Sequence, residues 1–338
     1  MSSLSLAALG ADERLWAYTA DLPLDHLIGR VTRVDRGRCR VATAGGTYRP
    51  HVQEPVAVGD WVIVSPDTER VTDVVPRRSA LTRRAAGEPT GAQTLAANID
   101  HVLLVHGLDR PVNRRRLERE LVLAWDSGAV PIVVLTKADL CADVDAAVAT
   151  AEAVALGVDV LAVSATDGQG LERVRRRVGA GRTFVLIGAS GTGKSTLVNA
   201  LAGADRLATA EVRAGDRRGR HTTTAGELVV LAGGAILIDT PGIRSVGLWT
   251  DGDDDGLAST FADVEELATA CRFPDCAHDR EPGCAVRDGV DEARLASWRR
   301  LRRELERTAG DRAGWERAEA NKRMRARGRS YKAIKARP

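Results

Sequence analysis

The sequence predicts an α/β protein in which a small β-barrel precedes a parallel sheet and a helical, cysteine-containing region follows it. Three observations support this order. Short β-rich runs fill residues 29–84, apolar strand runs alternate with helical stretches over residues 101–240, and three cysteines with one histidine lie in the charged segment that follows. Strands that alternate with helices are typical of a parallel sheet covered by helices on both faces.

The composition is that of a globular protein, with room for two or three domains in 338 residues. No run of about eighteen apolar residues occurs, so we expect no transmembrane helix, and the N-terminal stretch lacks the features of a secretory signal. The cysteine count is five, an odd number, and three of the five crowd beside a histidine. This usage indicates a reducing cytoplasm and a metal site and argues against a disulfide framework. The lack of a long apolar run leads us to expect no membrane partner.

Residues 1–23 are expected to be a loosely ordered lead-in, and residues 24–84 to form an OB-fold barrel. The second region contains the runs GRVTRV, RCRVAT, TYRPHV, DWVIVS and RVTDVV, separated by Gly, Pro and Asp turns. Several arginines would give the barrel a basic surface: Arg30, Arg33, Arg36, Arg38, Arg40 and Arg49. Aromatic stacking platforms for RNA are scarce, with Tyr48 and Trp61 the main candidates, and Trp61 fits the core better than the surface. Residues 85–97 are small and polar and predict a linker or loop.

A parallel sheet is predicted next, with strands at residues 101–106, 131–136, 158–164 and 183–188. Helices are expected around residues 113–126 and 142–156 and from Lys194 onward. The runs ELVVL and AILIDT flank a Gly-Gly turn and predict an antiparallel hairpin. Cys39 and Cys141 are interpreted as buried small hydrophobic residues.

The segment from Gly188 to Ser195, GASGTGKS, fits the phosphate-binding P-loop pattern at every fixed position. It follows an apolar strand and opens a helix, which is the context that this motif requires. The glycines let backbone N–H groups surround phosphates, and the helix N-terminus adds partial positive charge. Lys194 would bridge the β- and γ-phosphates, and Ser195 would bind Mg²⁺.

Two further segments fit around the same phosphates. Asp239-Thr-Pro-Gly242 ends a strand where P-loop enzymes place an acidic residue near Mg²⁺ and a glycine near the γ-phosphate. Between the P-loop and this segment lies RHTTT, in which a threonine, assigned here as Thr223, would complete the Mg²⁺ shell. The sequence alone does not choose among the three threonines.

The tetrapeptide Thr136-Lys-Ala-Asp139 resembles the guanine-reading motif of GTPases. Its aspartate can accept two hydrogen bonds from guanine N1–H and N2–H₂, which adenine lacks. Ser164 and Ala165 follow the next strand and suit the second base loop, where a backbone N–H meets guanine O6. The base motifs precede the P-loop here, whereas the usual GTPase has the opposite order. A circular permutation that joins the old ends through residues 171–183 accounts for this.

The cysteine block contains Cys271, Cys276, His278 and Cys284. Three thiols and one imidazole are a complete tetrahedral zinc set with no open position, so we expect one structural zinc ion.

Four apolar residues then recur at helical spacing and predict a docked helix: Leu295, Trp298, Leu301 and Leu305. Residues 299–338 contain 15 Lys or Arg and 5 Asp or Glu, whereas the preceding residues contain 34 and 41. This basic tail suggests a polyanionic partner, although a solvated surface helix is an open alternative.

These motifs together resemble the circularly permuted ribosome small subunit-dependent GTPase A family, also called RsgA or YjeQ, over roughly residues 25–305. The resemblance rests on VGDWV, PRRSALTRR, AANIDHVLLV, LTKADL, the P-loop, GRHTTT, DTPGIRSVGL and the cysteine block. It implies an OB-fold, placed at residues 24–84, a permuted GTPase domain at 98–257 and a zinc-binding domain at 258–308. The basic tail, assigned to residues 309–338 from its charge, lies beyond the resemblance. The resemblance also implies a GTPase that acts in late maturation of the small ribosomal subunit and is stimulated by that subunit.

The resulting expectation is a monomer that binds GTP or GDP, with Mg²⁺ and zinc as cofactors and the small subunit and its rRNA as partners. Ser195, Thr223 and Asp239 would hold Mg²⁺. Ile243 stands where many GTPases carry the water-orienting glutamine, so His221 is the candidate catalytic residue beside Lys194, with contact to RNA or solvent as its alternative. The expected GTP contacts are Thr136, Lys137, Ala138, Asp139, Ser164, Ala165, Gly188, Ala189, Ser190, Gly191, Thr192, Gly193, Lys194, Ser195, Thr196 and Gly242.

Two competing functions are a non-hydrolytic RNA-binding scaffold with a structural nucleotide site and a P-loop ATPase. The presence of Lys194, Ser195 and Asp239 argues against the scaffold, and Asp139 argues against the ATPase.

Overall fold

The structure is a computed structural model that describes residues 5–23, 25–84, 92–203, 226–239 and 255–309. His221, Thr223, Gly242 and Ile243 lie outside these ranges, as does the basic tail from residue 310 onward. Within the described ranges, no helix combines the length and the apolar character needed to cross a bilayer.

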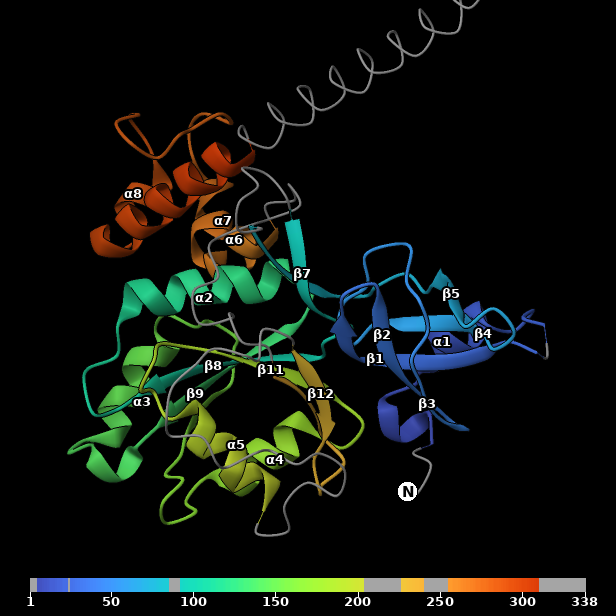
Figure 1. Ribbon diagram of the computed structural model, residues 1–338. Helices are drawn as coiled ribbons and strands as arrows, with labels where there is room; N and C mark the ends of the chain where they lie inside the picture. The colour runs from blue at the N-terminus through green and yellow to red at the C-terminus, as the bar shows by residue number, and fades with distance from the viewer. Residues whose placement is uncertain (1–4, 24, 85–91, 204–225, 240–254, 310–338) are drawn as a thin grey trace, which may run out of the picture.

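The central sheet contains five parallel strands in the order β10-β9-β8-β11-β13, with β12 antiparallel beside β13. The strand bounds are β8 His101–Gly107, β9 Val130–Thr136, β10 Val160–Ala162, β11 Thr183–Ile187, β12 Glu227–Val230 and β13 Ile236–Asp239. All the predicted strands and the predicted hairpin are therefore confirmed. The carboxyl ends of the parallel strands share one edge of the sheet (Figure 1). The strand order changes direction between β8 and β11, because β9 and β10 lie on one side of β8 and the later strands β11 and β13 lie on the other.

Helices cover both faces of this sheet, as the alternation of strands and helices predicts. On β8, Val102 and Leu104 belong to one core with α2 (Arg114–Asp126) and α3 (Val144–Glu152), whereas Leu103 and Val105 belong to the other. The second core contains α4 (Leu171–Val178) and α5 (Lys194–Ala202), which lie below the sheet in Figure 1. Successive residues of a strand point to opposite faces, so one apolar run supplies both cores.

The N-terminal strands form a closed OB-type barrel. The strands are β1 (Leu27–Asp35), β2 (Arg38–Thr43), β3 (Gly46–Tyr48), β4 (Trp61–Ser65) and β5 (Arg70–Val74). Antiparallel ladders join β3 to β2, β2 to β1, β1 to β4 and β4 to β5. His51 closes the ring, because it bridges both Arg38 and Arg70.

Three expectations for the N-terminal half are wrong. The lead-in is ordered from residue 5 to residue 23, with a 3₁₀ turn η1 (Ala7–Leu9), helix α1 (Glu13–Tyr18) and fully buried Leu9 and Leu15. Residues 92–97 of the expected linker form strand β7 (Ala92–Ala97), which pairs with β6 (Ala80–Arg84). Arg30 is 1% exposed and does not belong to the barrel surface. The first and third errors arise from packing against segments that are distant in sequence, whereas the second arises from a hairpin-like pairing of β7 with the preceding strand β6.

The other predicted features of the barrel and the cysteines have mixed outcomes. Trp61 and Cys39 are buried, as expected, and burial raises the pKa of the Cys39 thiol to about 12. Cys141 is only partly buried, because it follows a short 3₁₀ turn at the surface. Arg33 and Arg49 both pair with Asp35, and Arg40 pairs with Glu227, so acidic partners offset much of the expected basic surface.

The barrel and the central sheet are joined by hydrogen bonds into one continuous sheet. Arg33 of β1 pairs with Glu227 of β12 in an antiparallel bridge. The C-terminal region packs over α2 (Figure 1) and contains α6 (Asp255–Thr260), α7 (Ala262–Ala268), α8 (Ala285–Gly289) and a helix at residues 292–309. The predicted apolar stripe of the last helix is confirmed, since all four of its residues are buried: Leu295, Trp298, Leu301 and Leu305.

Candidate nucleotide and metal sites

The predicted P-loop connects the end of β11 to the start of α5 and adopts a backbone that only glycine can supply. Gly191 and Gly193 have φ values of 82° and 85°, in the left-handed region. Gly188 has φ 153° and lies so close to the carbonyl of Val105 that a Cβ atom would overlap it. The loop therefore sits tightly against β8 and turns its backbone toward the carboxyl edge of the sheet.

Lys194 folds back over this loop. Its ammonium group donates to the carbonyl oxygens of Gly188, at 2.8 Å, and Ala189. It also lies 3.5 Å from the hydroxyl of Thr192. The ammonium group thus lies over the concave side of the loop, where the P-loop motif requires the lysine to meet phosphate oxygens.

Thr136 links the expected base motif to the P-loop. Its hydroxyl donates to the carbonyl of Thr192 at 2.5 Å and contacts the carbonyl of His106 at 3.2 Å. Thr136 is 2% exposed and is separated from Thr192 by 56 residues in the chain. The structure thereby brings together two motifs that the sequence places far apart, in the arrangement that the permutation requires.

Lys137 has a partner that sequence reasoning missed. The residue is left-handed, with φ 60°, and its ammonium group pairs with Asp109 Oδ2 at 3.0 Å. This hydrogen bond holds the pKa of the Asp109 carboxyl below its usual range. Asp109 follows β8, whose final Gly107 stands opposite Thr136 in the parallel ladder. The sequence could have indicated Asp109, because it follows the carboxyl end of β8, the strand next to the P-loop strand β11.

The second expected base loop follows β10. The Ser164 backbone N–H donates to Gln169 at 3.0 Å, and its hydroxyl lies 2.9 Å from that of Thr166. Asp167 accepts from the Gln169 N–H and from Ser164, and these bonds lower the pKa of its carboxyl. Ala138 in turn donates to Val163 at 3.1 Å, which ties the two base loops together. The loop that contains Ala165 is thus shaped by its own polar contacts.

The remaining expected contacts lie at the same edge or outside the described residues. Asp239 is the exposed last residue of β13, which runs parallel to β11. Ser195 and Thr196 lie in the first turn of α5. The roles predicted for His221, Thr223 and Gly242 fall outside the described ranges and stay predictions.

The four predicted metal ligands converge. The ligand atoms of Cys271, Cys276, His278 and Cys284 all lie within 4.8 Å of one another. His278 Nδ1 is 3.6 Å from the sulfur of Cys271 and 3.5 Å from that of Cys284. Three thiols and an imidazole at this spacing suit a tetrahedral cation site, with zinc the metal that such a set prefers.

The electrostatics of this cluster favour a bound cation. Backbone N–H groups of Val286 and Ala285 lower the pKa of the Cys271 thiol. Burial and the neighbouring Cys284 and Cys271 raise the pKa of Cys276 to about 11. Several thiolates crowded together repel one another, and a divalent cation would remove that penalty. Arg299 supports the site from the last helix by donating to the His278 carbonyl at 3.1 Å.

Comparisons with known proteins decide the family. The family model described as RsgA GTPase matches residues 74–249. The chain belongs to the RsgA GTPase family. The RsgA-type relative from Streptomyces coelicolor, named small ribosomal subunit biogenesis GTPase RsgA, is 46% identical over 327 residues, covering 91% of this chain and 88% of its own. A second, RsgA 2 from Lactiplantibacillus plantarum, is 40% identical and covers 86% of this chain and 87% of its own length.

Two solved structures confirm the fold. YjeQ from Thermotoga maritima superposes with a TM-score of 0.64 at 24% identity, covering 83% of this chain and 98% of that one. YloQ, described as a circularly permuted GTPase, gives a TM-score of 0.61 at 24% identity, with 85% and 97% coverage. The fold expected from the sequence, with its permuted order of motifs, is therefore confirmed. As a member of the RsgA GTPase family this chain is a GTP hydrolase, and the non-hydrolytic scaffold is not supported.

Proposed function

We propose that this GTPase hydrolyses GTP at the carboxyl edge of its central sheet and thereby assists late maturation of the small ribosomal subunit. The observation that carries the proposal is the contact of Thr136 with the Thr192 carbonyl, which joins the base motif to the P-loop. The role in small-subunit maturation is inferred from the names of the relatives, which are called small ribosomal subunit biogenesis GTPases. The proposed setting is the cytoplasm, and the proposed form is a monomer.

GTP binding would change the contacts of Lys194. In the structure its ammonium group is held by loop carbonyls, and phosphate oxygens would compete for the same donor with full negative charge. The backbone N–H groups of Gly191, Thr192 and Gly193 would surround the phosphates together with the helix N-terminus. Ser195, Asp239 and Thr223 are the proposed Mg²⁺ ligands, and the ion would neutralise charge on the β- and γ-phosphates.

Guanine recognition is assigned to the two base loops. Asp139 would accept both guanine donors, and the stem of Lys137 would lie along the base. Asp109 adds to this proposal, because its ion pair holds Lys137 on the loop. Ser164 and Ala165 would frame the base oxygen from the neighbouring loop, whose shape is set by its hydrogen bonds to Gln169 and Thr166.

The chain also connects the nucleotide site to its two flanking domains. Strand β12, which follows the threonine loop, pairs with the barrel through Glu227 and Arg33. The segment after Asp239 leads into α6, where the N–H of Gly256 donates to Asp126 of α2 at 2.8 Å. We propose that the nucleotide state changes how the zinc-binding module is held, with zinc at Cys271, Cys276, His278 and Cys284. His221 remains the proposed group that orients the attacking water.

The decisive experiment measures GTP turnover with and without purified small ribosomal subunits. We expect slow turnover alone and a clear increase on adding subunits. Asp139→Asn should lose about 2–3 kcal/mol of GTP binding, the free energy of a charge-assisted bidentate contact, and should gain affinity for xanthosine triphosphate. Asp145→Asn, an exposed change on α3, is the matched control.

Two results would contradict the proposal at different points. Equal GTP affinity of Asp139→Asn and the control would contradict the assignment of residues 136–139 to guanine recognition. Turnover that is the same with and without small subunits, in a wild-type protein that binds GTP, would remove the ribosomal role while leaving the nucleotide site intact.

A further inference from the structure

A basic cavity opens at the edge of the sheet opposite the P-loop. It has a volume of about 690 Å³ and lies where the amino ends of β8 and β9 meet the segment between α4 and β11. His101 and Val130 line it from the starts of β8 and β9, and Asp100 and Arg182 line it from just before β8 and β11. The nucleotide motifs occupy the carboxyl ends of the same strands, so this cavity is separate from the GTP site.

Arginines dominate the lining of this cavity. Five of them contribute, from α1, from the approach to β6, from α4 and from the approach to β11: Arg14, Arg78, Arg176, Arg177 and Arg182. Asp100 is the single carboxylate among the described lining residues. The lining therefore carries a large positive excess within a small volume, which attracts anions and raises their local concentration.

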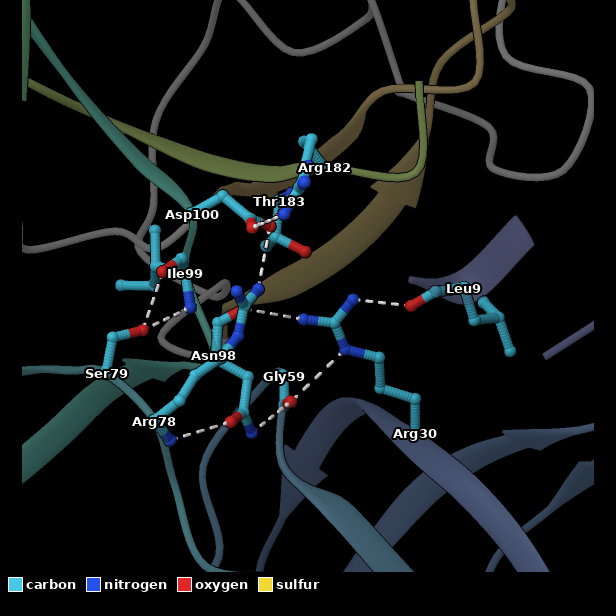
Figure 2. A network of polar contacts seen from close by, with 10 residues as sticks. All are labelled: Leu9, Arg30, Gly59, Arg78, Ser79, Asn98, Ile99, Asp100, Arg182 and Thr183. Carbon is cyan, nitrogen blue, oxygen red and sulfur yellow. Dashed lines mark hydrogen bonds and ion pairs between the residues drawn. The ribbon is translucent and has the colours of Figure 1, made fainter. Parts of the chain in front are cut away.

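Asp100 neutralises only part of this charge (Figure 2). It accepts from Arg78 at 2.8 Å, from Arg182 at 2.9 Å and from the backbone N–H of Thr183 at 2.7 Å. These bonds hold the pKa of its carboxyl below the usual range despite burial. One carboxylate shared by two guanidinium groups leaves one positive charge unbalanced, and it fixes both arginines in place at the cavity wall.

The remaining three arginines differ in how far they are compensated. Arg177 pairs with Asp159. Arg14 and Arg176 are exposed and make no hydrogen bond or ion pair with the residues that the structure describes. The side chain of Arg182 is 61% exposed and that of Arg177 is 45% exposed. The guanidinium groups thus lie at the rim of the cavity, with donors available to a ligand that passes over it.

The floor of the cavity is also polar. His101 is buried, and its Nδ1 has no hydrogen-bond partner among the described residues. Burial is the main cause that lowers the pKa of His101, and Arg177 and Arg182 lower it further. The lowered pKa favours the uncharged ring, whose Nδ1 offers a hydrogen-bonding group to the cavity.

We infer that this cavity binds the phosphodiester backbone of RNA, with Arg14, Arg176 and Arg182 as its main contacts. A rim of exposed arginines from three separate chain segments suits a chain of phosphates that runs across the opening, whereas a small buried anion requires donors that converge inside. Arginine also matches phosphate geometry with two parallel N–H donors. The inference deepens the proposed function, on which it rests, by assigning a specific surface to the RNA partner.

The test compares two arginines on the same helix. Arg176 lines the cavity, whereas Arg173, three residues earlier, is exposed outside it and equally lacks a described partner. Binding of purified small subunits, with a non-hydrolysable GTP analogue present, is measured from low to high salt. Each phosphate contact that is lost should lower the slope of log K against log salt by about 0.7–0.9. Arg176→Ala should show this loss with about a two- to fivefold lower affinity, and Arg173→Ala should not.

The double variant Arg14→Ala/Arg176→Ala extends the test across the opening. We expect the slope to fall by about twice the single value, or roughly 1.4–1.8, with unchanged GTP binding. Equal slopes for wild type and Arg176→Ala, when wild type binds subunits, would overturn the inference without touching the proposed function. Failure of wild type itself to bind subunits would count against both.

A second probe separates an RNA chain from a small anion. Inorganic tripolyphosphate is titrated into full-length protein whose P-loop is saturated with GTP analogue. A strong thermal shift by tripolyphosphate, abolished in Arg14→Ala/Arg176→Ala, would show that the cavity is a small-anion site and would overturn the RNA assignment. Little or no shift, together with the slope change on subunits, supports it.

Discussion

Two buried arginines hold the flanking domains to the central sheet, and they do so with opposite chemistry. Arg30 joins the barrel to the sheet, and carbonyl oxygens accept all the hydrogen bonds that it makes within the described residues, from Leu9 at 2.5 Å, Gly59 at 3.2 Å and Asn98 at 3.0 Å (Figure 2). The guanidinium group also lies over the Trp61 ring at 5.4 Å. It is thus a buried charge held by neutral dipoles.

Arg294 joins the C-terminal region to the sheet domain through the Glu118 carboxylate, and Asp263 of α7 holds it from within the C-terminal region. It donates to Asp263 at 2.6 and 2.7 Å, lies 3.7 Å from Glu118 of α2, and stacks over the Phe261 ring at 4.8 Å. It also donates to the carbonyls of Thr260 at 3.0 Å and Val154 at 3.4 Å. The Arg294 and Glu118 side chains are 5% and 3% exposed. Here two opposite charges share one buried site.

The difference predicts how each joint fails. Removing Arg30 leaves neutral carbonyl groups without a donor, whereas removing Arg294 leaves a buried carboxylate without a counter-ion, which costs more. The barrel joint has the additional support of the bridge between β1 and β12. The C-terminal joint has no such strand pairing among the described residues and rests on packing between α2 and α6. We therefore expect it to be the more fragile of the two.

The largest effect expected is that of metal removal. Chelation should unfold the C-terminal module, because structural zinc binding contributes about 10–16 kcal/mol to the folding of small zinc modules. The barrel joint should be unaffected, since its arginine makes no contact with the metal cluster. Hydrogen-exchange mass spectrometry with and without chelator checks this: peptides over 262–309 should lose protection while those over 27–35 and 92–107 keep it. Loss of protection in all of them would contradict the separation of the two joints.

Arg294→Met should destabilise the C-terminal joint by about 3–5 kcal/mol, the range measured when one partner of a buried ion pair is removed. Local opening free energies from hydrogen exchange over residues 114–126 and 255–309 measure it. Arg307→Met, an exposed change on the same helix, is the control and should stay within about 0.5 kcal/mol. A loss as small as the control would show that packing alone holds this joint.

The same variant should be sensitive to pH. Burial already raises the pKa of the Glu118 carboxyl, and Arg294 is one of the groups that lower it. The folded chain then binds this proton more tightly than the unfolded chain, so stability falls as pH rises from about 4.3 through the raised pKa. Without Arg294 that pKa rises further, and the destabilisation of Arg294→Met should be greater at pH 7 than at pH 5. Equal destabilisation at the two pH values would contradict the role given to Glu118.

Arg30→Met should destabilise the barrel joint by about 2 kcal/mol, because the loss of hydrogen bonds is partly offset by removing a buried charge. Burial lowers the pKa of Arg30 to about 10, so the group stays charged near neutrality and the effect should not change between pH 5 and pH 8. Urea unfolding at both pH values tests this, with Arg36→Met as the exposed control on the barrel. A destabilisation by Arg30→Met that changes between pH 5 and pH 8 would contradict the difference proposed between Arg30 and Arg294.

The smallest effect is expected for the exposed ion pair beside the strand bridge. Arg40 and Glu227 lie 3.6 Å apart, with side chains 40% and 38% exposed. Arg40→Ala should lower the unfolding free energy by less than about 1 kcal/mol, and added salt should reduce the difference further. A larger loss would mean that side-chain pairing, rather than the backbone bridge, stabilises this edge of the sheet.

The sequence predicts the elements whose signal is local. The P-loop, the base tetrapeptide after residue 135 and the hairpin at β12 and β13 depend on residue types at fixed spacing, and the structure has each strand, turn and helix where the pattern places it. The cluster of four metal ligands is also predictable from local sequence, because its residues lie within fourteen positions and a single turn of the chain brings them together. The buried stripe that begins at Leu295 follows from the helical period alone.

Only the tertiary structure decided the features that depend on what packs against a residue. Arg30 has the sequence neighbourhood of a surface arginine, yet Leu9, Gly59 and Asn98 surround it from three distant segments. Asp109 meets Lys137, and five arginines from four segments line one cavity, for the same reason. A strand's period of two tells which residues share a face, but it does not tell whether protein or water covers that face. That choice is made by long-range contacts, which no local pattern encodes.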